Sequence, residues 1–345
     1  MMTPRGQETL REIADGVHAY LQQGSWGFSN AGLVGSQSTA LLVDTLYDVP
    51  STERMLAAMK RVLPSAARID TVVNTHANGD HCWGNQSVGA STIVSSRAAA
   101  EEMLELKPAA MFAMVSAARA LTRLNPGSRR LLSLLGRLGV PRIGPLARAA
   151  EFVIDCFGPF EFRGIHLTLP TMTFSGHTTL SVGDRSVELI EVGPAHTKGD
   201  VLAYLPKERV VFTGDILFIG SHPIVWQGPV RNWIAACDQL LALDVDVVVP
   251  GHGPLTTKEG VRQTKRYWEE LVSFVERGRA AGAEPLEIAR SWTSNTFGSW
   301  QEAHRVVVNV DTIYRELAGD TRHADPVALF EKMADYERTA AKHVA

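Results

Sequence analysis

Residues 69–81 read IDTVVNTHANGDH, and they hold the most informative pattern of this sequence. The β-branched run 69–75 predicts a strand that leads directly into His76. Gly79 lets the backbone turn tightly there, so that the side chains around it can gather at one point. Imidazole nitrogens and carboxylate oxygens are ligands that a zinc-like ion prefers. The segment therefore predicts a metal site at the end of a strand, with four candidate ligands within six residues: His76, Asn78, Asp80 and His81.

Three further clusters share this arrangement, in which a predicted strand is followed at once by a ligand-type side chain. They read GPAHTKGD at 193–200, FTGD at 212–215 and VVPGHGP at 248–254. Their candidate ligands are His196, Asp215 and His252. Four strands that end in such side chains indicate a site built at one edge of a sheet.

Taken in order, the motifs H-x-[HN]-x-D-H, G-P-x-H-T-x-G-D, F-T-G-D and P-G-H-G resemble those of the metallo-β-lactamase superfamily. The resemblance covers residues 15–257. It implies an α/β fold, the αβ/βα metallo-β-lactamase sandwich, with a metal centre at the sheet edge. Asp44, in the run LVDT, matches a structural aspartate of that family rather than a ligand.

The resemblance also assigns the ligands to two metal positions that Asp215 bridges. The first position takes His76, residue 78 and His196. The second position takes Asp80, His81 and His252. The implied nucleophile is a metal-bound hydroxide, because the cations lower the pKa of bound water toward neutrality. Asp80 is also expected to orient that water or to shuttle a proton, which makes it a candidate catalytic residue.

Asn78 departs from the family motif, which has a histidine at this place. An amide oxygen is a weaker and harder ligand than imidazole, so the first position is expected to bind metal less tightly. Three alternatives follow: two metals with a weak first position, a single metal at the second position, or an Asn78 that binds substrate instead. The expected cofactor is zinc, as one or two ions, with iron or manganese as the alternatives.

Trp83, His222 and Trp226 are candidate substrate contacts, because they follow ligand motifs closely along the chain. Aromatic side chains beside a metal suit an apolar or aromatic substrate with a polar reacting group. The alternative is that the two tryptophans only pack the loops. His222 could donate to an oxyanion or a leaving group, so it joins Asp80 as a candidate catalytic residue.

We therefore expect an enzyme, a metal-dependent hydrolase that attacks an electrophilic carbon of a thioester, ester, lactone or activated aromatic substrate. Within the superfamily, the C-terminal helices and residues 78–85 are similar to members that act on polyketide thioesters, and to a hydrolytic dehalogenase of chlorinated aromatics. The alternatives are an iron-dependent oxidoreductase with the same fold and a non-catalytic binding protein with a degenerate site. β-Lactamase activity itself is not expected.

Residues 1–257 form the expected metallo-β-lactamase-like domain, with a helical insertion at 97–150 and a helical C-terminal extension at 258–345. Residues 106–150 contain eight basic and no acidic side chains. This segment is expected to form either a basic lid over the site or a solvated helical face. A basic lid could recognise a carboxylate, a carrier-bound thioester or another acidic partner, or touch an anionic membrane.

The composition narrows the class of protein. The chain has 345 residues, of which 45% are hydrophobic, and a formal net charge of −3. These values exclude a wholly disordered chain and argue against a nucleic-acid-binding protein. The N-terminus shows no apolar segment of a signal peptide, and no window reaches the ~18 apolar residues of a membrane helix. The expectation is a cytoplasmic enzyme that acts on a small molecule and could form a homodimer.

Apolar patterns predict further helices and strands. Ser51 is expected to cap a helix that continues to Val62. The insertion at 97–150 is expected to hold two or three helices, with a break at Pro126-Gly127. After residue 150, short apolar runs predict strands, which include the runs 152–157 and 165–169.

Overall fold

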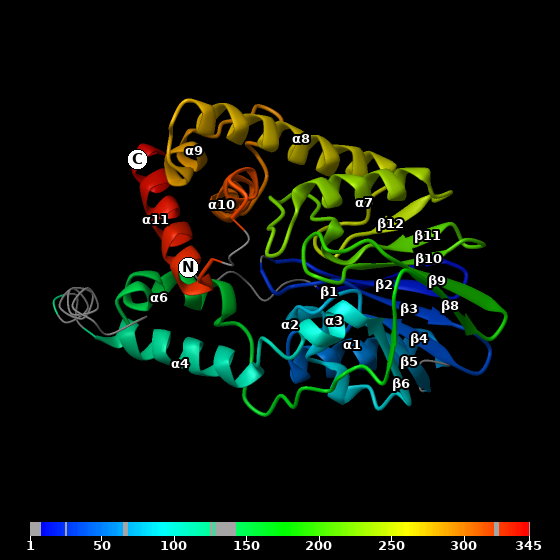
Figure 1. The fold of residues 1–345 in the computed structure, drawn as a ribbon. Helices are drawn as coiled ribbons and strands as arrows, with labels where there is room; N and C mark the ends of the chain where they lie inside the picture. Colours follow the sequence, from blue (N-terminus) through cyan, green and yellow to red (C-terminus); the bar gives the residue numbers. More distant parts are fainter. Residues whose placement is uncertain are drawn as a thin grey trace.

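The computed structural model describes residues 8–24, 26–64, 68–124, 127, 143–320 and 324–344. Two β-sheets face each other in it (Figure 1). The larger sheet has the strand order β1-β2-β3-β4-β5-β6-β7, so each strand pairs with its neighbour in the sequence. The bounds of these strands are β1 Glu8–Ala14, β2 Val17–Gln22, β3 Ala31–Gly35, β4 Ala40–Val43, β5 Ile69–Val73, β6 Thr92–Ser96 and β7 Met172–Phe174.

The smaller sheet has the strand order β12-β11-β10-β9-β8. The bounds of these strands are β8 His177–Val182, β9 Arg185–Glu191, β10 Val201–Leu205, β11 Val210–Phe212 and β12 Val247–Val249. Strands β4 to β7 pair in parallel in the larger sheet, and β11 pairs in parallel with β12 in the smaller one. Because parallel strands end at the same edge, the loops that follow them gather there.

Gly32 of β3 shows how closely the two sheets pack. A Cβ at this position would lie 2.2 Å from Cε1 of Phe212, which belongs to β11 of the other sheet. Only a glycine leaves room for that ring. Around it, buried apolar side chains of both sheets form one core, among them Val34, Leu41, Val43, Val73, Leu189 and Ala203.

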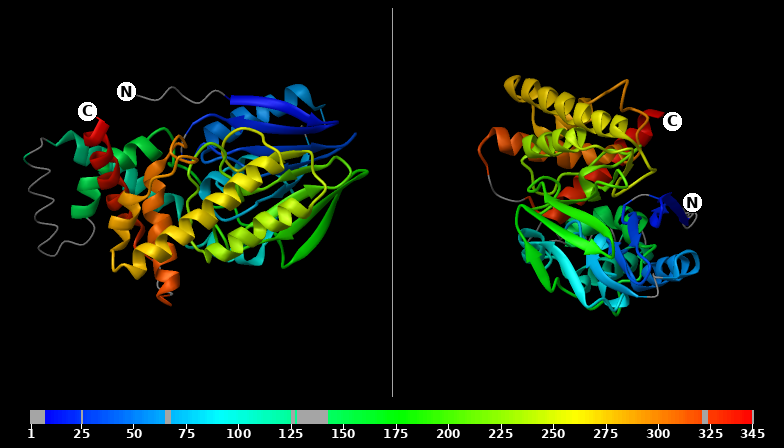
Figure 2. Two further views of the ribbon diagram at one scale, coloured as in Figure 1. Left: turned by 90° about the horizontal axis from the view of Figure 1, so that it is seen from above. Right: turned by 90° about the vertical axis from the view of Figure 1, so that its right-hand side faces the viewer.

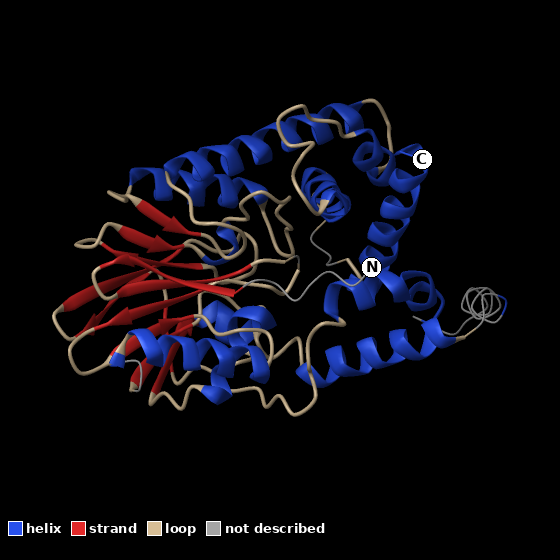
Figure 3. Ribbon diagram, turned by 180° about the vertical axis from the view of Figure 1, so that it is seen from behind, coloured by secondary structure: helices blue, strands red, loops and turns tan. Residues whose placement is uncertain are grey.

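Helices cover the outer faces, and Figure 3 shows them in blue on both sides of the red strands. Helix α1 (Val49–Val62) buries Met55 and Met59 in a core that it shares with Leu42 of the larger sheet. On the other side, α7 (Val230–Ala242) packs against α8 (Lys258–Ala280). The order helix, sheet, sheet, helix confirms the predicted αβ/βα sandwich.

Helix α1 begins earlier than predicted. Its N-cap is Asp48, whose Oδ1 accepts a hydrogen bond from Ser51 N at 2.9 Å, and Ser51 lies inside the helix. The prediction of Ser51 as the cap is therefore wrong. Pro50 is the reason, because proline is well tolerated in the first turn of a helix and does not delay its start.

The insertion is helical, as predicted, and consists of α3 (Arg97–Glu102), α4 (Pro108–Arg123) and α6 (Ile143–Phe157) in the described residues. The strand predicted at 152–157 is wrong, because these residues form the last turns of α6. A short apolar run does not distinguish a buried helical segment from a strand. The predicted break at Pro126-Gly127 and four of the eight basic side chains fall on or next to residues that lie outside the described ranges.

The strand predicted at 165–169 is also wrong, because the chain is irregular there. Side chains satisfy part of its backbone in place of a neighbouring strand. Gln86 Oε1 accepts from His166 N at 2.6 Å, and Asn85 Nδ2 donates to Thr168 O at 3.1 Å. An apolar pattern alone does not show whether such a segment has a partner strand.

The C-terminal extension consists of α8, α9 (Pro285–Ser291), α10 (Val306–Leu317) and α11 (Pro326–Val344). Helix α11 packs against both α10 and α6, so these helices form one helical part beyond one end of the sandwich, whereas α8 runs along α7 (Figure 2, left). Trp26, in a loop of the sandwich, contacts Phe152 and Phe330 of this part. Within the described ranges, every helix is too short or too polar to span a membrane.

Candidate metal centre

Four loops bring the predicted ligands to one edge of the sandwich. Each loop follows a strand: β5, β9, β11 or β12. Asp80 and His81 lie on the short helix α2 (Gly79–Cys82), and Asp215 lies in a 3-10 turn after β11. The six histidine and aspartate candidates are each at most 9% exposed: His76, Asp80, His81, His196, Asp215 and His252. The structure therefore brings these candidate ligands together.

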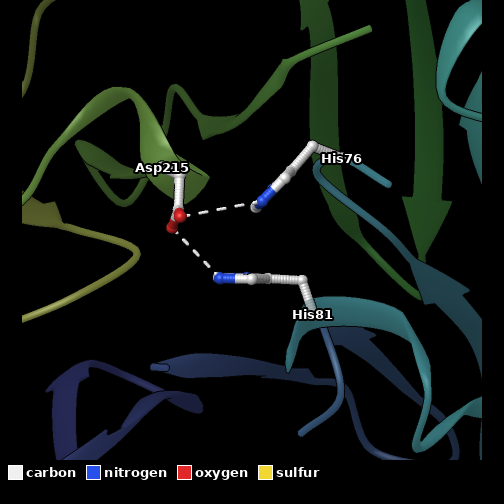
Figure 4. A group of neighbouring side chains, drawn as sticks. All are labelled: His76, His81 and Asp215. Atoms are coloured by element: carbon white, nitrogen blue, oxygen red, sulfur yellow. Dashed lines mark ion pairs between the residues drawn. The ribbon is translucent and has the colours of Figure 1, made fainter. Parts of the chain in front are cut away.

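Asp215 stands at the centre of this cluster. Its Oδ1 lies 3.1 Å from Nε2 of His81 and 3.3 Å from Nε2 of His252. Its Oδ2 lies 3.3 Å from Nε2 of His196 and 3.8 Å from Nε2 of His76. Figure 4 shows the carboxylate between His76 and His81. Each oxygen thus faces one pair of imidazoles, which is the arrangement that a carboxylate needs to bridge two metal positions.

Asp80 completes a second group of ligands. Its Oδ2 lies 3.4 Å from Nε2 of His252 and 3.8 Å from Nε2 of His81. The ligand atoms of these three residues lie within 4.8 Å of one another. The three residues assigned to the second position are therefore close enough to share one ion.

The Nδ1 atom of each of the four histidines is directed away from the cluster and meets an oxygen. These contacts are Thr75 Oγ1 at 3.0 Å from His76, Asp44 Oδ2 at 2.8 Å from His81, Ile224 O at 2.7 Å from His196 and Phe28 O at 3.1 Å from His252. A neutral imidazole carries a single N–H, so donation from Nδ1 leaves the lone pair on Nε2. Partners of this kind orient metal-ligating histidines and fix their tautomer.

Asp44 positions two parts of the site. It accepts hydrogen bonds from the backbone N and from Oγ1 of Thr75, both at 2.7 Å, and its Oδ2 contacts His81. The residue has a positive φ of 61°, a conformation that L-residues other than Asn and Asp rarely adopt. This geometry fits the structural role that the resemblance implied for Asp44.

Burial and neighbouring charges act in opposite directions on the pKa values of the ligands. Burial alone would raise the pKa of the Asp215 carboxyl, but His252 and His81 hold it well below its usual range. Burial alone would lower the pKa of His252, but Asp215 and Asp80 raise that pKa to about 9. The carboxylates therefore stay ionised, and their buried negative charge favours a divalent cation at the same place.

Two glycines allow the backbone to pass close to the Asp215 carboxylate. A Cβ on Gly251 would lie 2.1 Å from Asp215 Oδ1, so a larger residue would displace the carboxylate. Gly214 has a φ of 49°, in the left-handed region that glycine adopts without strain. These two positions explain why the motifs FTGD and PGHG need a glycine beside the ligand.

The donor set fits a zinc-like ion. His76 Nε2, His81 Nε2 and Asp215 Oδ1 are buried and have no hydrogen-bond partner in the described structure. A buried polar atom without a partner is costly, typically by about 1–3 kcal/mol, and a bound cation would satisfy all three atoms. Zinc takes imidazole and carboxylate ligands, and so do iron and manganese. The residues thus fit a metal centre without selecting the element.

Asn78 lies at this centre too. Its Nδ2 is 2.9 Å from Nε2 of His196, the atom that the first metal position would use. As an N–H donor, the amide would compete with a metal for the lone pair of that nitrogen. With the amide turned over, its oxygen would face the same point, and the two orientations are not distinguished by shape. Asn78 is thus placed to affect the first position in either way.

The two candidate tryptophans lie in different surroundings. Trp83 is 2% exposed and packs against Tyr47 and Phe162, with ring centroids 5.3 and 5.8 Å away. Its position is that of a core residue. Trp226 is half-buried, and its backbone N donates to His196 O at 3.1 Å. Only Trp226 of the two therefore combines partial exposure with a direct bond to a ligand residue.

His222 is buried among residues of the C-terminal extension. Its Nδ1 lies 3.2 Å from Oη of Tyr267, and its ring contacts Trp300. Burial, followed by the charge of Arg305, lowers the pKa of His222 to about 4. Within the described chain, no hydrogen bond or ring contact joins this imidazole to the metal ligands. A catalytic role for His222 stays a prediction.

Two supporting residues escaped the reasoning from sequence. Asp200 caps the loop of His196, because its carboxylate accepts from Ala195 N at 3.1 Å and from Thr197 Oγ1 at 2.7 Å. Asn309 is the other residue, because its side chain bonds the backbone of Pro223 and Val225, on either side of the Ile224 carbonyl that His196 contacts. The signal that could have found it is a single amide in the apolar run VVVNV at 306–310.

Comparison with known proteins adds three relatives. The chain is 24% identical over 250 residues to a linear primary-alkylsulfatase of Pseudomonas sp., which covers 68% of this chain and 43% of that protein. It is 38% identical over 84 residues to the 2,4-dinitroanisole O-demethylase subunit alpha of Nocardioides sp., and this match covers 24% of this chain and 26% of that protein. It is 26% identical over 98 residues to an acyl-coenzyme A thioesterase of Homo sapiens, and this match covers 27% of this chain and 34% of that protein. Each match spans less than half of the relative's own length.

Solved structures and a family model agree with this fold. A sec-alkylsulfatase from Pseudomonas sp. superposes with a TM-score of 0.64 at 16% identity, over 90% of this chain and 50% of that one. A metallo-beta-lactamase from Pontibacter korlensis superposes with a TM-score of 0.51 at 18% identity, over 76% of this chain and 99% of that one. At these identities the likeness shows the fold. The model of the metallo-beta-lactamase superfamily matches residues 24–252, more than half of the chain and all six ligand candidates. The chain belongs to the metallo-beta-lactamase superfamily.

Proposed function

We propose that this member of a superfamily of hydrolytic enzymes is a metal-dependent hydrolase of esters or thioesters. The observation that carries the proposal is the position of Asp215, whose two carboxylate oxygens each face a pair of imidazole Nε2 atoms. Four histidines with fixed tautomers and two ionised carboxylates form a donor set for a hydrolytic metal centre. A bound divalent metal supplies a nucleophile from water near neutral pH and polarises the bond under attack.

The residues of the chain divide the remaining work. Asp80 faces His252 with one carboxylate oxygen, and we assign it the orientation of the attacking water and the transfer of its proton. Asp44 and Asp200 keep the loops of His81 and His196 in place. Because these ligands are buried and held from behind, the site is preorganised before any substrate arrives.

The substrate class is proposed from two kinds of support. Trp226 is half-buried and its backbone is bonded to His196, so we assign its side chain to an apolar or aromatic group of the substrate. Two relatives are an alkylsulfatase and an acyl-coenzyme A thioesterase, which act on a sulfate ester and a thioester. An ester or thioester with an apolar portion fits both.

The proposal is tested with purified protein of residues 1–345 loaded with zinc. We would measure hydrolysis of 4-nitrophenyl butyrate, butyryl-coenzyme A, hexyl sulfate and a chromogenic cephalosporin. Turnover of an ester or thioester is expected, without turnover of the cephalosporin. Asp80→Ala should abolish turnover and strip metal from the second position. Asp70→Ala, which removes a half-buried carboxylate that accepts from Thr39 and Arg68, is the matched control and should leave both unchanged. Turnover and metal content that survive Asp80→Ala would contradict the mechanism.

An activated aromatic ether or halide is the second candidate substrate. The observation in its favour is the 38% identity over 84 residues to the 2,4-dinitroanisole O-demethylase subunit alpha. Release of 2,4-dinitrophenolate from 2,4-dinitroanisole is followed by its yellow colour. Release that depends on Asp80 would support this candidate, and a complete lack of release would remove it.

A further inference from the structure

Residues 220–230 form a segment that lies between His196 and the C-terminal extension. On one side, the segment forms hydrogen bonds with both the side chain and the backbone of His196. Ile224 O accepts from His196 Nδ1 at 2.7 Å, and the backbone N atoms of Trp226 and Gln227 donate to His196 O, both at 3.1 Å. The orientation of His196 therefore depends on where this segment, and above all the carbonyl of Ile224, is placed.

On its other side, the segment is bonded to residues of the extension. Gln301 N donates to Gly220 O, and His222 N donates to Gln301 O, both at 2.9 Å. Arg305 Nη1 donates to His222 O at 3.0 Å. These bonds run along the backbone of the segment one after another, so the extension sets its path.

Asn309 of α10 makes the bonds that lie nearest to Ile224. Its Oδ1 accepts from Val225 N at 3.0 Å, and its Nδ2 donates to Pro223 O at 2.8 Å. The same Nδ2 lies 3.0 Å from Oη of Tyr267. Asn309 is 0% exposed. A buried amide is retained at little cost only when its donors and acceptors are used, and here both ends are.

We propose that Asn309 is a positioning residue of the metal centre. It grips the residues on either side of Ile224, and this aims the Ile224 carbonyl at Nδ1 of His196. The tautomer and ring orientation that present Nε2 toward Asp215 follow from that contact. The inference rests on the proposed metal centre and adds that the C-terminal extension is part of it.

The effect is specific to one metal position. His81 and His252 of the second position take their Nδ1 contacts from Asp44 and Phe28, which belong to the sandwich. His196 of the first position takes its contact from a segment that the extension holds. Loss of Asn309 should therefore weaken the first position and leave the second largely intact.

The test uses the full chain, stripped of metal and titrated with Co²⁺ while the visible absorption of the bound ion is recorded. Asn309→Ala should weaken Co²⁺ binding at the first position and change the absorption of that ion. Loss of an outer partner of a ligating histidine costs about 10–100-fold in affinity, and we expect a loss of up to this size because Asn309 holds that partner, the Ile224 carbonyl, in place. Asn309→Asp keeps the acceptor for Val225 N but turns an oxygen, in place of the donor, toward Pro223 O, so it should weaken the first position too. If the alanine variant does not fold, the aspartate variant carries the comparison.

Glu316→Ala is the matched control. Glu316 lies on the same helix and accepts from Val230 N, at the end of the same segment, without touching the residues beside Ile224. It should lower stability without weakening Co²⁺ binding. The inference is overturned if Asn309→Ala binds Co²⁺ like the wild type, or if Glu316→Ala weakens binding as much. A wild-type protein that binds no Co²⁺ would overturn the proposed metal centre itself, which is a different result.

Discussion

Asp215 faces all four candidate histidine ligands because its neighbours leave it room and direct their Nε2 atoms toward it. The four histidines donate from Nδ1 to Thr75, Asp44, Ile224 and Phe28, and so direct Nε2 inward. The backbone at residue 251 passes so close to the carboxylate that no side chain fits between them. At the scale of single residues, the site is thus defined as much by what supports the ligands as by the ligands.

Gly251→Ala tests this crowding directly. The added Cβ would lie 2.1 Å from Asp215 Oδ1, so the carboxylate must turn away from His81 and His252. We expect the variant to fold and to lose at least tenfold in zinc affinity, measured by competition with a chromogenic chelator. Gly89→Ala is the control for adding a methyl group at a glycine with nothing within 4 Å. Equal zinc affinity in the two variants would contradict the proposed place of Asp215.

Asn78→His tests the first metal position. An imidazole there would add a stronger ligand next to His196, whose Nε2 lies 2.9 Å from the present amide. We expect the metal-to-protein ratio to rise, as measured by elemental analysis after dialysis against dilute zinc. An unchanged ratio would show that residue 78 does not contribute to the metal centre.

That the candidate ligands gather at one place could be predicted from sequence, because each lies in a loop after a strand and belongs to an ordered set of short motifs. His76 and His252 are examples, and the structure places both beside Asp215. Their supports could not be predicted in the same way. Ile224 and Phe28 contribute backbone oxygens, which any residue type can offer, and Asn309 lies far along the chain from the histidine that it affects.

At the scale of helices and strands, neighbouring residues can favour different boundaries or different types of secondary structure. The periodic apolar positions of α1 were sufficient to predict that helix, but its first residues were not, because Pro50 and Ser51 both fit near a helix start. The run 152–157 was mistaken for a strand since its apolar residues are consecutive. Strands β7 and β8 were missed, because their burial patterns include exposed residues at the sheet margin.

Asp48→Ala tests the start of α1. Asp48 caps the helix through Ser51 N, and its Oδ2 also accepts from Glu161 N at 2.9 Å. We expect a loss of about 1–2 kcal/mol in the free energy of unfolding, from the cap and the second bond together. Urea denaturation measures it, with Ser51→Ala as the control, because that side chain is not the cap. A larger loss for Ser51→Ala would return the cap to the residue that the sequence suggested.

At the scale of the whole molecule, sandwich, insertion and extension share one apolar core. Trp26 of the sandwich, Phe152 of the insertion and Phe330 of the extension are part of the same buried cluster. Arg148, in the basic segment of residues 106–150, forms an ion pair with Glu331 of α11, so part of the positive charge of that segment is balanced within the chain. The role of this segment as a lid for an acidic partner stays a prediction, and binding that weakens steeply with added salt would support it.

A chain shortened to residues 1–257 tests this unity. Removing α8 to α11 would expose the apolar cluster that α7 and α6 share with them. We expect the shortened chain to aggregate, or to show no cooperative unfolding by circular dichroism. A soluble shortened chain with cooperative unfolding and full metal affinity would contradict both the shared core and the proposed role of the extension.

Elemental analysis of the purified protein and of its Asp215→Asn variant tests the central claim most directly. The substitution keeps the size of the side chain but removes the charge that faces all four histidines. The account predicts at least one equivalent of zinc, iron or manganese per chain in the wild type, and a loss of most of it in the variant. A wild-type chain that holds no such metal even after incubation with each ion, or a variant that retains the full content, would contradict it.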